Sequence, residues 1–232
     1  MATHAVRTAR QRQLADDLFK WGAVAFGEFE LKMHEAYPDA PKSPIYISIR
    51  PLPKGVLTVD QLEHIGAELY AHAKKKGLEY DHICGLPKAG TPLAEGFIKA
   101  AAADGRPGLI NVVLIKEETT TSRRLTGIDG QYPPGKVLVL DDLITKSETK
   151  LEAIELLRSG GFTVVDCLVV VDREQGGEDG MSRAQVALHW ILPFASLLRY
   201  YVKQGKITRT QLKLVSDYQT RVDEFMATQP PT

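Results

Sequence analysis

Two adjacent acidic residues end an apolar run near the middle of the chain. Asp141 and Asp142 follow the run 137–140, and a short stretch of hydroxyl and charged residues, 145–149, separates them from a helical pattern. Carboxylates in such a place can accept hydrogen bonds from the vicinal hydroxyls of a ribose or orient a hydrated Mg²⁺ ion. Hydroxyl groups and free N–H groups at the start of a helix suit a phosphate. The segment therefore predicts a site for a ribose phosphate ester.

A plain structural interpretation of the same segment stays open. Thr145, Ser147 or Thr149 can cap the following helix with a side-chain oxygen, and the two acids can be solvated. Capping accounts for the hydroxyl groups, but it does not account for two acids at the end of a buried strand. We therefore favour the phosphate site over the capped helix.

Three other turns follow apolar runs in the same way. They are Gly85–Pro92, Lys116–Pro134 and Asp172–Gly177. The first is also typical of an ordinary Gly- and Pro-rich turn, and Arg173 in the last can form a surface ion pair with Glu174 or Glu178. Ligands of open parallel sheets bind where the carboxyl ends of the strands meet. We therefore expect all four turns to lie together and to form one site.

The elements that position these turns alternate between strand and helix. Uninterrupted apolar runs such as 137–140 and 168–171 are typical of central parallel strands buried on both faces. The alternation predicts a doubly wound α/β fold, with a central parallel sheet flanked by helices. The expected strands cover residues 82–85, 109–115, 136–140, 163–171 and 186–190. The expected helices cover residues 59–76, 92–103, 149–159, 193–203 and 208–227.

The first fifty residues follow a different pattern. Residues 9–26 have apolar positions at helical spacing, while residues 26–31 and 45–49 are typical of strands, so we expect a helix and a small hood beside the core. The predicted division is an N-terminal helix and hood, an α/β core and a C-terminal helix. These three segments cover residues 1–57, 58–204 and 205–232.

The bulk composition excludes several classes of protein. The 232 residues carry 29 basic and 29 acidic side chains, so no global charge attracts nucleic acid or an anionic membrane. No apolar run approaches the roughly 20 residues that cross a bilayer, and no export signal is visible. Cys84 and Cys167 lie in expected buried strands without metal-ligand spacing, which predicts core thiols. We expect a cytoplasmic protein that binds neither nucleic acid nor membrane.

Residues 137–149 resemble the motif that binds 5-phosphoribosyl-1-diphosphate (PRPP) in type I phosphoribosyltransferases. In that motif two acids follow apolar residues, and two more apolar residues, a Thr and a small loop follow the acids. Within this class the chain resembles orotate phosphoribosyltransferase, including the form fused in uridine monophosphate synthases, from about Trp21 to Tyr200. The segment Val171–Gly177 is nearly the family's own sequence, and residues 26–32 with 42–47 are similar to its hood.

The resemblance implies a fold and a reaction. The fold is that of the type I phosphoribosyltransferases, with a small N-terminal hood. The reaction is transfer of phosphoribose from PRPP to orotate, which gives orotidine 5′-monophosphate and pyrophosphate in pyrimidine nucleotide biosynthesis. The family also implies a homodimer and a Mg²⁺ ion that is bound mainly through PRPP, so no metal site of the protein's own is expected.

The resemblance further implies roles for individual residues. Asp141 and Asp142 would hold the ribose hydroxyls. The turn that would cradle the 5-phosphate consists of Thr145, Lys146, Ser147, Glu148 and Thr149. Arg173 would pair with a carboxyl or carbonyl oxygen of orotate through its planar fork of donors. Lys32 would approach the base or the anomeric side of PRPP.

Other residues would face the pyrophosphate group. The turn that follows residue 84 would be the pyrophosphate loop, in which backbone amides up to Gly90 and the side chain of Lys88 face the leaving group. Lys116 matches the family's mobile catalytic loop, and Arg123 and Arg124 would supply charge there from a shifted register. Electrostatic stabilisation of the leaving pyrophosphate is the chief task in this chemistry.

Lys88 lies one position before the Lys that many bacterial relatives use in the pyrophosphate loop. Five further positions depart from the family pattern, namely Ile115, Thr119, Thr121, Ser147 and Glu148. The first three replace an Arg, a Lys and a His of the catalytic loop, and the last two replace a glycine and a small hydroxyl residue of the phosphate loop. The loss of cations favours a second hypothesis, a catalytically weak or inactive relative that binds PRPP or a nucleotide as a regulatory module. A third hypothesis is a transferase for another base.

Overall fold

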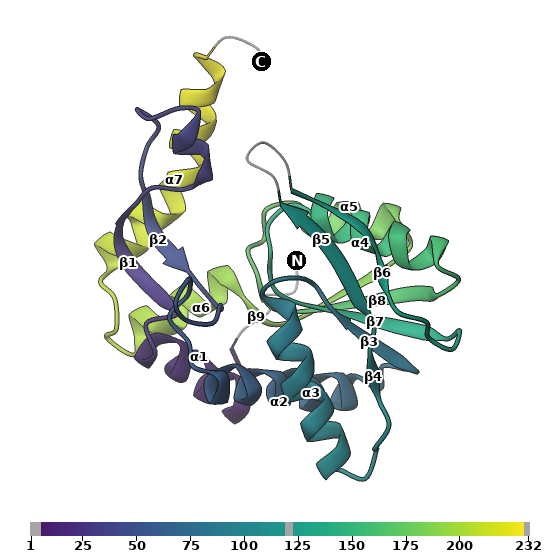
Figure 1. Ribbon diagram of the computed structural model, residues 1–232. Coiled ribbons are helices and arrows are strands. Elements are labelled where there is room, and N and C mark those ends of the chain that lie inside the picture. The colour runs from purple at the N-terminus through teal and green to yellow at the C-terminus, as the bar shows by residue number, and fades with distance from the viewer. Residues whose placement is uncertain (1–5, 119–122, 230–232) are drawn as a thin grey trace.

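The computed structural model describes residues 6–118 and 123–229 of the chain. These residues form a larger lobe around a parallel sheet and a smaller lobe that contains the hood and the C-terminal helix (Figure 1). The expected departures from the family pattern at Thr119 and Thr121 lie outside the described residues.

A parallel sheet of five strands forms the larger lobe. The strands lie in the order β4-β3-β7-β8-β9, and every neighbouring pair is parallel. They are β3 at His82–Gly85, β4 at Ile110–Asn111, β7 at Lys136–Ile144, β8 at Thr163–Asp172 and β9 at Ala187–Pro193. The expected α/β fold with a central parallel sheet is confirmed.

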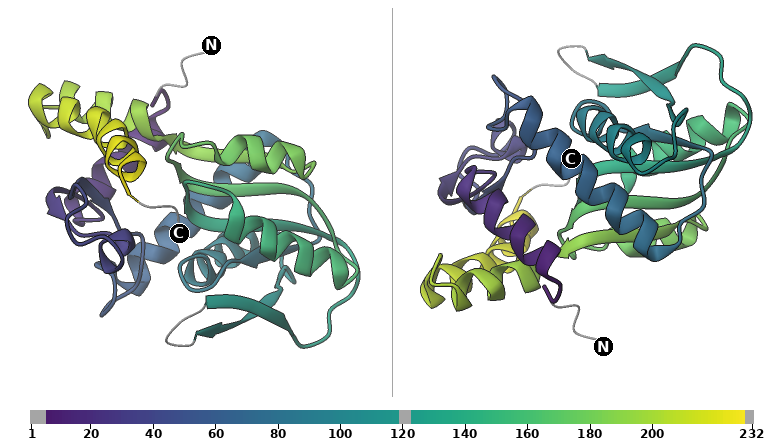
Figure 2. Two further views of the ribbon diagram at one scale, coloured as in Figure 1. Left: turned by 90° about the horizontal axis from the view of Figure 1, so that it is seen from above. Right: turned by 90° about the horizontal axis from the view of Figure 1, so that it is seen from below.

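Helices cover both faces of this sheet (Figure 2). On one face lie α2 at Val59–Lys76 and α3 at Gly90–Ala103, and on the other lie α4 at Glu148–Ser159 and α5 at Gly177–Arg183. Of these four helices, α5 is the one that the sequence did not predict. Its seven residues are too few to show helical periodicity against the glycines around them.

The uninterrupted apolar run in β7 is explained by the two hydrophobic clusters that the sheet separates. Leu138 and Leu140 belong to the cluster that includes α2 and α3, whereas Val137 and Val139 belong to the cluster that includes α4. Successive residues of a strand point to opposite faces. A strand that is covered on both faces therefore needs an apolar side chain at each position.

The smaller lobe combines the two ends of the described chain. Its elements are α1 at Ala9–Lys20, β1 at Val24–Phe29, the 3₁₀ helix η1 at Lys32–Glu35, β2 at Ser43–Ile47, α6 at Phe194–Lys203 and α7 at Arg209–Ala227. Strands β1 and β2 form an antiparallel pair, and α7 packs against β2. Leu14, Leu62 and Val215 lie in one hydrophobic cluster. The predicted boundaries at residues 57 and 204 thus separate segments that share a core, and the division stays a prediction.

The expected strand at residues 109–115 and the expected loop at 116–134 were wrong. Strand β4 ends at Asn111, the chain leaves the sheet, and β5 at Val113–Glu118 pairs with β6 at Arg123–Asp129 as an antiparallel ribbon. Cross-strand pairs of opposite charge stabilise such ladders, and Glu117 lies opposite Arg124. Most of the ribbon is not buried, so its strands contain many polar residues. They therefore lack the apolar pattern from which a strand is predicted.

Two smaller corrections concern the ends of elements beside the expected site. Strand β7 continues to Ile144 rather than ending at Leu140, because its last residues pair with β8 as far as Asp172. Helix α3 begins at Gly90 rather than Pro92, since the N–H of Gly90 donates to the carbonyl of Leu86 (2.7 Å). Both acids therefore lie within a strand and not after it.

The two cysteines are core thiols, as expected. Cys84 and Cys167 are fully buried, and burial raises the pKa of each to about 12. Within the described residues, no helix combines the length and the apolar character that a membrane span requires.

Candidate active site

Three of the four expected turns meet at the carboxyl edge of the sheet, where β3, β7 and β8 end. The N–H of Leu86, just after β3, donates to the carbonyl of Leu140 in β7 (2.9 Å). The N–H of Arg173, just after β8, donates to the carbonyl of Ile144 at the end of β7 (2.9 Å). Parallel strands bring their carboxyl ends to one edge of a sheet. These three turns therefore lie together as expected, and their forming one site stays a prediction.

The two acids are not solvated, because a buried lysine holds them. Lys150 in the first turn of α4 donates to Oδ2 of Asp141 (2.6 Å) and to the carbonyl oxygen of Leu143 (2.8 Å). The side chains of Lys150 and Asp141 are only 7% and 13% exposed. The N–H of Asp142 donates to Oδ1 of Asp141 (2.9 Å), and the N–H of Leu143 donates to Oδ1 of Asp142 (2.8 Å). The carboxylates are therefore fixed in position by the backbone and by one ammonium group.

The electrostatics of this pair are unequal. Burial, and then the negative charge of Asp141, raise the pKa of Asp142 to about 7, while the charges of Lys150 and of Arg50 act in the opposite direction. Burial is the largest single influence on the pKa of Lys150 and lowers it, but the charge and hydrogen bond of Asp141, together with Cys167 and Asp142, raise the pKa above its ordinary value. The site thus combines an ion pair between Lys150 and Asp141 with a second carboxyl group that takes up a proton near neutral pH.

Sequence reasoning missed Lys150. The signal that marks it is its place on the buried face of α4, where Ala153, Ile154 and Leu157 follow it at spacings of three, four and seven residues. Residues at these spacings share one face of a helix. A lysine on an apolar stripe, nine residues after an acid at a strand end, indicates a buried ion pair.

The start of α4 offers unbonded backbone donors to a ligand. Thr8, Thr58 and Thr208 cap α1, α2 and α7 through capping boxes, but no side chain caps α4, where Ser147 is the N-cap residue, or α3. The first N–H groups of a helix have no partner within the helix. The alternative that a hydroxyl of this turn caps α4 is therefore wrong, and the helix start is open to an anion.

The hydroxyl group of Ser147 points into the protein rather than toward solvent. Ser147 is buried, and an ideal Cβ added to Gly180 of α5 would lie 1.8 Å from its Oγ. The glycine in α5 thus provides the space for the side chain that stands where the family has a glycine. Lys146 and Glu148 are exposed on either side of it, so the carboxylate of Glu148 lies in solvent.

In the expected pyrophosphate loop, segments of backbone approach one another closely. A Cβ on Gly85 would lie 2.3 Å from the carbonyl oxygen of Gly90, and a Cβ on Gly90 would lie 2.5 Å from that of Leu140. Only glycine fits at both positions. Lys116 of β5 donates to the carbonyl oxygen of Pro87 (3.3 Å), which joins the ribbon to this loop. Lys88 is exposed at the tip of the loop.

Arg173, one of the expected ligand-binding cations, is half-buried. Its guanidinium carbon lies 4.5 Å from the centre of the Phe194 ring, and its buried Nε has no hydrogen-bond partner among the described residues. Burial lowers its pKa. Glu174, with which an ion pair was the alternative, accepts a hydrogen bond from the N–H of Ala195 (2.6 Å) instead. A buried donor without an acceptor is costly, so Arg173 is suited to an oxygen atom that a ligand supplies.

A cavity of about 770 Å³ lies between the turn that joins β7 to α4 and Arg173. Thr145 and Lys146 line it on one side, and Arg173 lines it with residues of α6 and α7. The α7 residues are Leu212, Val215, Ser216 and Gln219. The sequence predicted α7 as a separate C-terminal helix and gave no signal of this position, because it depends on packing against the hood.

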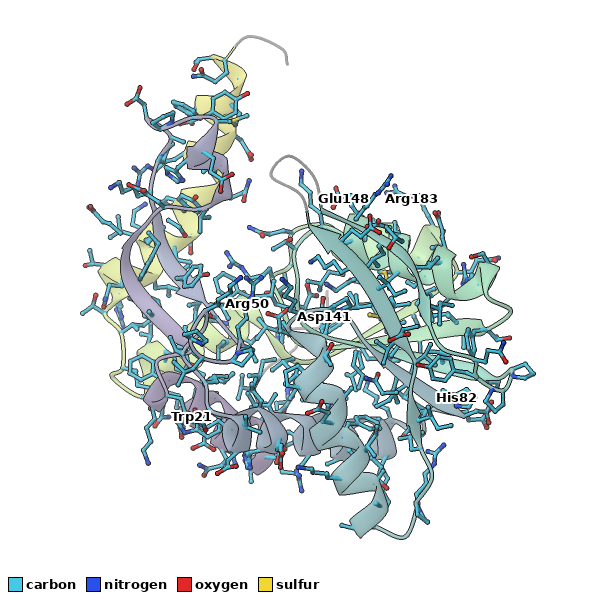
Figure 3. All side chains as sticks on the ribbon, viewed as in Figure 1. Trp21, Arg50, His82, Asp141, Glu148 and Arg183 are labelled. Atoms are coloured by element: carbon cyan, nitrogen blue, oxygen red, sulfur yellow. The ribbon has the colours of Figure 1, made fainter. Side chains whose placement is uncertain are left out.

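The structure describes the remaining residues that were expected at the site only in part. Lys32 belongs to η1 and Arg123 begins β6, but their side chains lie outside the described part of the structure. Arg124 is exposed on the ribbon. Figure 3 places Arg50, at the inner edge of the hood, opposite Asp141 of the core. Sequence reasoning missed Arg50, whose charge acts on the second acid.

The side chains that could bind a metal ion limit how such an ion could be held at this site. In the described ranges, no three His, Cys, Asp or Glu side chains gather as they would around an ion. Asp141 is already paired with an ammonium group. A Mg²⁺ ion that arrives with a ligand's own oxygen atoms fits this arrangement, because such an ion needs only one or two carboxylates and keeps several waters.

Proteins with similar sequences include uridine 5′-monophosphate synthases and orotate phosphoribosyltransferases. No protein-family model matches the chain. It is 28% identical over 219 residues to the uridine 5′-monophosphate synthase of Bos taurus, a match that covers 94% of this chain but 42% of the bovine protein. It is 30% identical over 189 residues to the orotate phosphoribosyltransferase of Thermoplasma volcanium, which covers 80% of this chain and 99% of the relative.

The fold comparison agrees with the sequence comparison. The UMP synthase of Leishmania donovani superimposes with a TM-score of 0.68 at 28% identity, over 92% of this chain and 42% of that structure. The chain thus spans about two fifths of the length of the synthases that it matches and nearly the whole of the shorter relative.

The raised pKa of Asp142 predicts a pH-dependent cost to stability. Its pKa is about 7 in the folded state and near 3.8 in the unfolded state, so the folded state binds the proton more tightly. The wild type should therefore lose stability relative to Asp142→Asn as pH rises from about 4 to about 7, by on the order of 2–4 kcal/mol. Urea denaturation at pH 5 and pH 8 measures this difference. The exposed change Asp129→Asn is the control, and a wild-type-to-variant gap that is equal at both pH values would contradict the prediction.

The buried ion pair predicts a large effect when its cation is removed. Lys150→Met leaves Asp141 buried without a counter-charge, which should destabilise the fold by about 3–5 kcal/mol. The double change Lys150→Met with Asp141→Asn should recover part of that loss. Lys213→Met removes an ion pair between exposed side chains and should cost no more than about 1 kcal/mol. Thermal and urea unfolding give all three values, and a double variant that is no more stable than Lys150→Met would refute the pairing.

Proposed function

Because the chain belongs to the orotate phosphoribosyltransferase family, we propose that it transfers the phosphoribosyl group of PRPP to orotate. The products are orotidine 5′-monophosphate and pyrophosphate. The observation that carries the proposal is the cavity that is lined both by Thr145 and Lys146, in the turn before α4, and by Arg173, whose Nε has no hydrogen-bond partner among the described residues. One end of this cavity suits a phosphate, and the other suits the oxygen atoms of an acidic base.

PRPP binding would use the turn between β7 and α4. The N–H groups at the start of α4, with Thr145 and the exposed ammonium group of Lys146, would hold the 5-phosphate. Asp141 would accept hydrogen bonds from the ribose hydroxyls, since Lys150 fixes its carboxylate. Asp142 is buried, so its contribution is to fix the backbone of the turn through the N–H of Leu143.

Orotate binding would use Arg173. A guanidinium group presents two parallel donors to a carboxylate, and the ring of Phe194 holds this one in place. The base would then lie between Arg173 and the ribose, with its ring nitrogen directed at the anomeric carbon. Holding both reactants in such an orientation removes much of the entropic barrier to the displacement.

The departing pyrophosphate would be stabilised by charge. Lys116 reaches the pyrophosphate loop from the ribbon, and Lys88 stands at the tip of that loop. These groups would act together with the backbone N–H groups near Gly90 as negative charge develops on the leaving oxygen. Mg²⁺, carried by the diphosphate of PRPP, supplies further charge neutralisation when it is bound.

The remaining expectations are proposals of the same kind. The family resemblance supports a homodimer, which sedimentation velocity checks. The balanced charge of the chain supports a protein that uses small-molecule substrates rather than nucleic acid. A cytoplasmic location stays a prediction.

The reaction is tested by assaying the whole chain with PRPP, Mg²⁺ and a panel of bases. Release of pyrophosphate with orotate, and formation of orotidine 5′-monophosphate, are the expected results, and Lys116→Ala should reduce both. PRPP at 100 times its dissociation constant should stabilise the fold by about 2.7 kcal/mol, which a thermal shift detects. A thermal shift without product from any base would replace the transferase with a PRPP-binding module. Product from another base alone would assign a different substrate.

The role of Arg173 is tested by measuring the effect of its removal on orotate and on PRPP separately. Arg173→Ala should raise the KM for orotate about ten- to a hundredfold, the equivalent of one charge-assisted hydrogen bond, and should leave the affinity for PRPP nearly unchanged. Arg183→Ala, at an exposed arginine of α5, is the control and should change neither. Equal losses for orotate and PRPP would mean that Arg173 supports the fold of the cavity and does not contact the base.

A further inference from the structure

Glu174, the residue after Arg173, has a strained backbone conformation. Its φ angle is +56°, in the left-handed region that residues other than Gly, Asn and Asp rarely adopt. Among the described residues, Gln185 is the other non-glycine residue with a positive φ, but it follows the end of α5, where helices commonly end in this way. Glu174 instead follows a strand. Strained backbone persists where surrounding contacts hold it, often at functional sites, so the contacts of Glu174 indicate what it does.

Two hydrogen bonds tie the backbone of this turn to the sheet. The N–H of Arg173 donates to the carbonyl oxygen of Ile144 at the end of β7 (2.9 Å). The N–H of Glu174 donates to Oδ1 of Asp172 (2.8 Å), and a bond from the backbone to an Asp two residues earlier is typical of turns. Asp172 is itself buried at the end of β8. The backbone that carries Arg173 is therefore fixed relative to the strands.

The side chain of Glu174 ties the same turn to α6. Its Oε2 accepts a hydrogen bond from the N–H of Ala195, in the first turn of that helix (2.6 Å). The N-cap residue of α6 is Pro193, whose side chain makes no capping hydrogen bond. The first N–H groups of a helix have no partner within the helix, and a negative charge is favourable beside them. Glu174 therefore caps α6 from a turn that lies 21 residues earlier in the chain.

The capped turn of α6 also carries the aromatic ring that contacts Arg173. Phe194 immediately precedes Ala195, and the centre of its ring lies 4.5 Å from the guanidinium carbon of Arg173. The carboxylate of Glu174 is bonded to the helix and not to the neighbouring guanidinium group. The Nε of Arg173 has no hydrogen-bond partner among the described residues. One side chain thus places the ring beside the arginine and leaves the arginine able to bind a ligand.

We propose that Glu174 is a positioning residue, which holds α6 so that the guanidinium group of Arg173 is oriented to bind the acidic base. Glu174 acts through Arg173 and does not contact the substrate, so this role rests on the proposed transfer to orotate. The role depends on the length of the side chain, because an amide oxygen can accept the same hydrogen bond without a charge. Two substitutions separate these properties. Glu174→Gln keeps the length and removes the charge, whereas Glu174→Asp keeps the charge, tolerates the left-handed backbone and is one methylene group shorter.

Steady-state kinetics with orotate and PRPP test this role. Glu174→Asp should raise the KM for orotate about tenfold, the equivalent of one charge-assisted hydrogen bond, and should leave the KM for PRPP within about twofold. Glu174→Gln should keep both values within about threefold of the wild type. Glu178→Asp makes the same shortening at an exposed acid of α5 and is the control, which should change neither value. Equal increases for both substrates in Glu174→Asp, or an equal loss in Glu174→Gln, would overturn the proposal.

A second measurement follows Arg173 without turnover. Its Nε–H group is buried, so the NMR signal of this group, assigned by its absence from Arg173→Lys, should exchange with solvent more slowly than that of the exposed Arg183. Glu174→Asp should accelerate this exchange at least about tenfold, and Glu174→Gln should not. An unchanged exchange rate in Glu174→Asp would overturn the proposal. If the wild type forms no orotidine 5′-monophosphate, the proposed function fails, and the exchange rates still decide whether Glu174 positions Arg173.

Discussion

The buried contact between Lys150 and Asp141 is the interaction on which the candidate site depends. Two successive carboxylates at the end of a central strand repel each other, and the low polarity of their surroundings makes the repulsion stronger. The ammonium group offsets it because only residues 145–147 separate β7 from α4, which delivers the lysine to the acids. The same short turn leaves the N–H groups of α4 open. In the proposed reaction, ribose recognition and phosphate recognition would therefore depend on one local geometry.

Much of the fold could be predicted from the sequence, because burial on both faces of a sheet leaves an apolar run at each central strand. The predicted bounds of α2 and β3 are those of the structure. The ribbon of β5 and β6 could not be predicted, since its pairing does not depend on burial. For the site, the turns follow from chain order, whereas the position of Lys150 and the wall that α7 contributes depend on contacts between distant segments, which no local pattern records.

The departures from the family pattern have unequal consequences in the structure. Ser147 is accommodated because Gly180 leaves room for it, and Glu148 is exposed. Ile115 lies on the ribbon and is 43% exposed, so its change from arginine removes a charge without disturbing the core. The turn between β7 and α4 therefore accommodates both of its departures, and the described departure that removes a cation is Ile115 on the ribbon. This is the part of the site where Lys116 still reaches the pyrophosphate loop.

The ribbon is also joined mechanically to the acids. The N–H of Leu125 in β6 donates to Glu152 of α4 (2.8 Å), and α4 carries Lys150 two residues before that glutamate. A displacement of the ribbon therefore acts on the helix that orients Asp141. Free-energy coupling between two sites is reciprocal, so a change in ribose affinity on moving the ribbon would be matched by an equal effect of ribose binding on the ribbon. The proposed ribose site and the ribbon that bears Lys116 are connected in this way through one helix.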